Sequence, residues 1–79
     1  MTTLHFDGLT PVQRVQNRID VYQRLIRTER TTIRRCYRNA HRFPNRADWW
    51  RQFAREGAGH IRHMTRALHD HERELAGLA

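Results

Sequence analysis

The segment His41–Asn45, HRFPN, decides the fold because it is the short break between two long amphipathic patterns. A proline disfavours the helical conformation in the residue before it, so Pro44 stops a helix that arrives at Phe43. Neither glycine nor proline occurs from residue 12 to residue 42. We therefore expect one helix over residues 11–41, a short turn, and a second helix over residues 46–76.

Apolar and semi-apolar residues recur at alternating intervals of three and four in both segments, which is the spacing of one helix face. The first series is Val12, Val15, Ile19, Tyr22, Ile26, Ile33, Cys36 and Ala40, and the second is Ala47, Trp50, Ala54, Gly57, Ile61, Met64, Leu68, His71, Leu75 and Leu78. Because the connection is short, the two helices should be antiparallel neighbours. The sequence predicts an all-α antiparallel two-helix hairpin. Folding about residue 43 places Glu29 opposite Gly57, and Tyr22 opposite Met64.

The ends of the helices carry recognisable signals. Thr10 suits the N-cap of the first helix, and Gln13 stands where it completes a capping box. Asn45 suits the N-cap of the second helix, with Asp48 as its partner. Gly57 and Gly59 lower helix propensity, so they indicate either a kink or a close approach of the two helices.

The length supports a single domain, with residues 1–8 as a tail and residues 9–79 as the hairpin. A chain of this size has a small core and is marginally stable. A second set of apolar positions lies off the main series and is here called the apolar strip: Val21, Leu25, Trp49, Phe53 and His60. We expect a second copy of the chain to cover the strip in a four-helix bundle, or a partner to cover it. The alternative is that Leu4 and Phe6 of the tail fold onto it.

All basic charge other than histidine comes from 15 arginines, against eight acids, and the net charge is +7. On the second helix the arginines form a narrow stripe, here called the arginine stripe: Arg51, Arg55, Arg62, Arg66 and Arg73. On the first helix a broader arc holds Arg24, Arg27, Arg30, Arg34, Arg35, Arg38 and Arg42. Drift of a GC-rich genome toward arginine would explain the missing lysine but not this placement. Such a surface favours acidic partners.

The leading hypothesis is a small non-enzymatic binding module that docks on an acidic protein surface and regulates or inhibits that protein. Its contacts would be the arginine stripe, Arg27, Arg34 and Arg38 of the first helix, and Trp49, since arginine and tryptophan are enriched at interface hot spots. Two alternatives stay open: a nucleic-acid-binding protein that contacts phosphates without reading sequence, and a structural homodimer. In size and helix content the chain resembles small phage-encoded regulators of host machinery, a resemblance that fixes no residue.

Other functions find little support in the sequence. A structural zinc site needs about four ligands, and His60 with His63 supplies two, so we expect neither metal nor cofactor. Glu29 has no second acid or base beside it, which argues against an enzyme. No apolar run approaches the roughly eighteen residues of a membrane span. The single cysteine, Cys36, and the absence of signal-peptide features in residues 1–8 favour a reducing cytoplasmic compartment.

Overall fold

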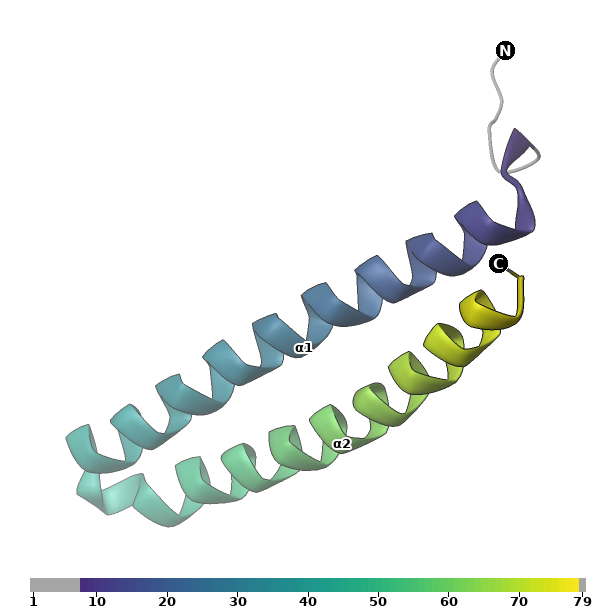
Figure 1. Ribbon diagram of the computed structural model, residues 1–79. Coiled ribbons are helices and arrows are strands. Elements are labelled where there is room, and N and C mark those ends of the chain that lie inside the picture. Colours follow the sequence, from purple (N-terminus) through teal and green to yellow (C-terminus); the bar gives the residue numbers. More distant parts are fainter. Residues whose placement is uncertain (1–7, 79) are drawn as a thin grey trace.

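The computed structural model describes residues 8–78, which fold as two long antiparallel helices (Figure 1). Helix α1 spans Pro11–Arg42, helix α2 spans Ala47–Leu78, and the 3-10 turn η2, Pro44–Arg46, joins them. The described part of the chain contains no strand. The predicted all-α hairpin is confirmed, and each helix begins and ends within two residues of the expected position. Most of the predicted tail, with Leu4 and Phe6, lies outside the described residues.

The predicted capping box begins α1. The backbone N–H of Gln13 donates to the Thr10 hydroxyl at 3.1 Å, and the Gln13 side chain accepts from the backbone N–H of Thr10 at 2.9 Å. Pro11 occupies the first helical position, where its missing N–H costs no hydrogen bond. The sequence therefore fixes the start of α1 locally.

The connection between the helices differs from the prediction. Phe43 leaves the helix with φ −124° and ψ 77°, as a residue before proline must, and its N–H still donates to the carbonyl of Asn39 at 2.8 Å. The N–H of Ala47 then donates to the carbonyl of Pro44, so η2 runs directly into α2. The prediction that Asn45 caps the second helix was wrong, because an N-cap needs a non-helical backbone and Asn45 lies inside the turn.

The core is the seam between the two helices. From α1 it buries Val15, Ile19, Ile26, Cys36 and Ala40, and from α2 it buries Ala54 and Gly57. All seven belong to the predicted apolar series. The larger side chains come from α1, whereas α2 offers small residues against which α1 can pack closely.

Gly57 of α2 lies close against side chains of α1. A Cβ atom there would lie 2.8 Å from both the Glu29 Oε2 and the Ile33 Cγ1 atoms. Helix α2 continues unbroken through Gly57 and Gly59. The glycine therefore serves helix packing rather than a kink, and the predicted placement of Glu29 opposite Gly57 is confirmed.

The pairing is displaced toward the open end of the hairpin, where the start of α1 and the end of α2 lie together (Figure 1). Tyr22 stacks on His71, with ring centroids 5.5 Å apart, rather than on the predicted Met64. The turn is centred on Asn45, two residues beyond the predicted folding point, and the partners near the open end are displaced, whereas Glu29 still lies beside Gly57. In addition, side chains lean toward the N-terminus of their own helix, so antiparallel partners meet from displaced positions.

Candidate functional site

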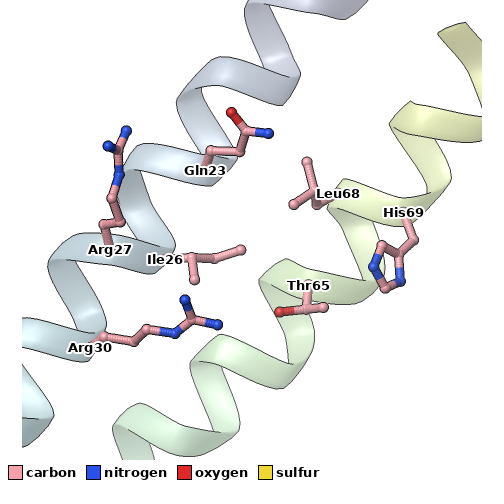
Figure 2. Close-up of a pocket in the computed structure, with 7 residues that line it drawn as sticks. All are labelled: Gln23, Ile26, Arg27, Arg30, Thr65, Leu68 and His69. Carbon is pink, nitrogen blue, oxygen red and sulfur yellow. The ribbon is translucent and has the colours of Figure 1, made fainter.

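A groove runs along one side of the seam, between α1 and α2 (Figure 2). Its central part has a volume of about 460 Å³ and is lined by Gln23, Ile26, Arg27, Arg30, Thr65, Leu68 and His69. Buried Ile26 and half-buried Leu68 form an apolar floor. Figure 2 shows the Arg30 side chain reaching across the gap toward Thr65, while the Arg27 side chain points away from α2. The walls are thus polar and cationic over an apolar floor.

Two adjoining hollows extend this groove because they share residues with it. Toward the open end the lining continues with Gln16, Ile19, Gln23, Glu72, Leu75 and Ala76. On the outer flank of α2 it continues with Ile61, Arg62, Thr65, Arg66 and His69. We call the whole feature the arginine groove and its four arginines, Arg27, Arg30, Arg62 and Arg66, the rim arginines. Along α1 it extends from Gln16 to Arg30, about 21 Å at 1.5 Å per residue.

The helical repeat explains why these residues share one side. Gln23 and Arg30 each come four positions after a seam residue, Ile19 and Ile26, and Arg27 comes one position after Ile26. Thr65 and His69 follow the seam of α2 in the same way. Because 100° separates successive residues, these offsets place the side chains on one flank of each helix, and the antiparallel packing brings the two flanks together.

The opposite side of the seam carries one arginine–glutamate ion pair and one histidine–glutamate contact that join the two helices. Arg18 Nη2 lies 3.4 Å from Glu74 Oε2, and His60 Nδ1 lies 3.8 Å from Glu29 Oε2. Within residues 8–78, no ion pair joins α1 to α2 on the groove side. The two glutamates that contact the other helix of the hairpin therefore lie on the side away from the rim arginines.

The apolar strip also lies on this opposite side. Val21 and Leu25 line a shallow hollow of about 340 Å³ together with Arg18 and Tyr22. Val21, Leu25, Trp49 and Phe53 are each between 46% and 48% exposed. Solvent therefore reaches all four apolar side chains in the single chain, and their burial by a second copy stays a prediction.

Trp49 lies at the centre of an aromatic cluster close to the turn. Its ring meets Trp50 edge-on at 4.7 Å between centroids, and Phe53 at 4.9 Å. Trp50 faces the seam, and its buried indole Nε1 has no hydrogen-bond partner within the described residues. His60, by contrast, contacts Glu29 across the seam, so it has a role inside the hairpin in addition to its place in the predicted strip.

The arginines of the arginine stripe have different surroundings in the structure. Arg62 and Arg66 line the groove. Arg51 pairs with Asp48 at 3.5 Å and Arg73 pairs with Asp70, so acids on the same helix compensate both ends of the stripe. Arg55 is exposed, and the described part of the chain offers it no ion pair.

On α1 only Arg27 of the three arginines selected from the sequence lines the groove. Arg34 and Arg38 are exposed nearer the turn and are not among its lining residues. The arc of arginines included Arg30, but its reach into the groove was not predicted. Gln23, Thr65 and His69 were missed altogether, although their offsets of one or four from the seam would have indicated them.

The groove offers hydrogen-bond donors and positive charge rather than reactive groups in a closed pocket. Arginine binds carboxylate and phosphate through two parallel hydrogen bonds. Between residues 8 and 78, no three His, Cys, Asp or Glu side chains gather closely enough to hold a metal ion. Over the same range, neither helix combines the length and apolar character that a membrane span requires. No protein-family model, curated protein or solved structure matches this chain.

Proposed function

We propose that the protein is a non-enzymatic binding module that docks the arginine groove on an acidic surface of a protein partner and so regulates or inhibits it. One observation carries the proposal. The side chains of Arg27, Arg30, Arg62 and Arg66 have no ion-pair partner among residues 8–78, although Arg18 and His60 on the other side face Glu74 and Glu29.

Clustered like charges have a cost that an acidic partner would remove. Arg62 and Arg66 are four residues apart on one helix, a spacing at which like charges destabilise the helix by a few tenths of a kcal/mol, on the order of 0.2–0.5. A carboxylate placed between them would reverse the sign of that interaction. Bidentate contacts to arginine would also fix the orientation of the partner.

The apolar floor favours a protein over a nucleic acid. Ile26 and Leu68 line the same hollow as Arg27 and Arg30, and a protein partner has apolar side chains to place against them. A nucleic-acid backbone would contact the arginines but would leave this floor without a partner. Nucleic acid therefore enters as an outcome of the test.

The apolar strip completes the proposal. A second copy covering Val21, Leu25, Trp49 and Phe53 would form a four-helix bundle and leave the grooves facing outward.

Cys36 is buried and unpaired, which suits a reducing compartment such as the cytoplasm.

Fluorescence anisotropy with labelled poly-glutamate, duplex DNA and single-stranded RNA tests the proposal at low and high salt. The groove variant is Arg30→Gln/Arg62→Gln/Arg66→Gln. The control, Arg24→Gln/Arg35→Gln/Arg42→Gln, removes the same charge from the face of α1 opposite the seam. We expect the groove variant to weaken poly-glutamate binding about tenfold or more, and the control by less than about twofold.

Circular dichroism must show equal helix content for the two variants before their affinities are compared. Equal losses in both variants would mean that binding follows bulk charge, and the docking proposal would be wrong. If a nucleic acid binds more tightly than poly-glutamate with the same dependence on the groove, nucleic acid replaces protein as the partner.

A further inference from the structure

We infer that the arginine groove receives an acidic amphipathic α-helix of the partner, which lies along the groove as a third helix. The inference rests on the proposed docking function and names the form of the docked segment. It uses three properties of the groove: its apolar floor, its two cationic rims and its length.

The floor selects a helix over an extended peptide. The groove lies between two helices whose backbone donors and acceptors are bonded within each helix, so it offers no strand edge for pairing. An extended segment over Ile26 and Leu68 would leave backbone polar groups facing an apolar surface, which is costly. A helix satisfies its own backbone and presents only side chains to the floor.

The rims select the charge pattern of that helix. Arg27 and Arg30 line the hollow over the apolar floor from the α1 side, and Arg62 and Arg66 line the adjoining hollow on the outer flank of α2. The complementary helix has one apolar stripe, with aspartate or glutamate on both of its flanks, the arrangement that flanking charges adopt beside the seam of a coiled coil. Charges on exposed rims also speed association and fix register.

The length and ends of the groove set the size of the docked segment. About 21 Å from Gln16 to Arg30 corresponds to about 14 residues, or four helical turns. Glu72 lies at the open end of the groove, opposite in charge to the rim arginines. The acids of the docked helix should therefore concentrate in the half beside Arg30 and Arg62, and the half beside Glu72 should be neutral or basic.

Two peptides of about 16 residues with one composition test the inference, each rich in leucine and glutamate. In the first, the leucines form a single helical stripe with glutamates on both flanks. In the second, the same residues are reordered so that no apolar stripe exists. We expect the striped peptide to bind the full chain at least about tenfold more tightly than the reordered one, because only it can bury leucines on the floor. Backbone amide NMR shifts should change at Gln23, Thr65 and His69.

Two double variants assign the binding to the rims. Arg30→Gln/Arg62→Gln should weaken the striped peptide about tenfold, and Arg24→Gln/Arg35→Gln, with the same loss of charge, by less than about twofold. Equal binding of the two peptides, with the loss confined to the groove variant, would overturn the helical occupant and leave acidic docking in place. Shifts centred on Val21 and Leu25, or no binding of either peptide, would overturn the inference as well. Poly-glutamate binding separately decides the docking proposal.

Discussion

The two sides of the hairpin use charge in opposite ways. On the side of the apolar strip, Arg18 contacts Glu74 and His60 contacts Glu29, so acidic side chains join the two helices through basic partners. On the groove side, the rim arginines face solvent, and no acid of residues 8–78 forms an ion pair with them. The chain has fewer acids than arginines, and the acids that reach the partner helix stand on one side. The contacts between charged or ionisable side chains that join the two helices thus lie on one side, and the side that we propose for docking has none among residues 8–78.

The largest expected effect is the difference in unfolding free energy between a substitution in the seam and one in the apolar strip. Ile26 is 6% exposed and its neighbour Leu25 is 46% exposed. We expect Ile26→Ala to lower the free energy of unfolding by about 2–5 kcal/mol, and Leu25→Ala by less than about 1 kcal/mol, in a single hairpin. Urea titration followed by circular dichroism measures both. A cost for Leu25→Ala that matches that of Ile26→Ala would show that the strip is covered in solution.

The predicted four-helix bundle gives the next effect. If a second copy covers the strip, Leu25→Glu/Phe53→Glu buries charge in that interface and should weaken dimerisation by about 2 kcal/mol or more. Light scattering on a sizing column should then give a dimer for the parent and a monomer for the variant. The variant Arg30→Gln/Arg62→Gln, on the groove side, should remain a dimer in the same measurement. A monomeric parent at all concentrations would refute the bundle.

The sequence was sufficient for two features that depend on local chemistry. The capping box of Thr10 and Gln13 and the break at Pro44 follow from rules that act within a few residues, so both could be predicted. The turn conformation was harder, because the 3-10 bonds of η2 competed with an Asn45 cap of similar plausibility. An error of two residues at the turn then displaced the pairing of Tyr22 at the far end.

The groove was only partly predictable, for a related reason. Helical periodicity assigns each arginine to a face of its own helix but does not show which flank the partner helix will border. Arg27, Arg62 and Arg66 were selected for charge, while Gln23 and Thr65 carry no charge, so only their offset of four from a seam residue could have indicated them. The pairings of Arg51 with Asp48 and of Arg73 with Asp70 also depend on side-chain conformations that spacing alone does not fix.

Substitution of Gly57 tests how closely the two helices pack against each other. Alanine is favoured over glycine in a helix by about 1 kcal/mol, but a Cβ at Gly57 would crowd Ile33 and Glu29, and overpacking costs about 1–3 kcal/mol. We expect Gly57→Ala to destabilise the hairpin by about 1 kcal/mol. At Gly59 the nearest atom, Arg62 Nη2, would lie 3.8 Å from the new Cβ, so Gly59→Ala should stabilise by about 0.5–1 kcal/mol. Thermal midpoints measure both, and a gain from both variants would contradict the close approach.

The smallest expected effect is on stability and compares two glutamates that are two residues apart on α2, one on each side of the hairpin. Glu74 contacts Arg18 at 3.4 Å and His71 at 3.4 Å, whereas Glu72 lines the groove and has no ion pair within residues 8–78. Both substitutions to glutamine change the net charge equally. We expect Glu74→Gln to cost less than about 1 kcal/mol, since the pair is half exposed, and Glu72→Gln to cost nothing measurable.

Salt provides the control for that last comparison. Screening at about 1 M salt shortens the range of surface electrostatics to roughly 3 Å, so the difference between the two glutamate variants should disappear in urea titrations run there. A difference that persists in high salt would assign the effect of Glu74 to packing rather than charge. Equal costs for Glu72→Gln and Glu74→Gln at low salt would mean that pairing is not confined to the side of the apolar strip, and the division between the two sides would fail.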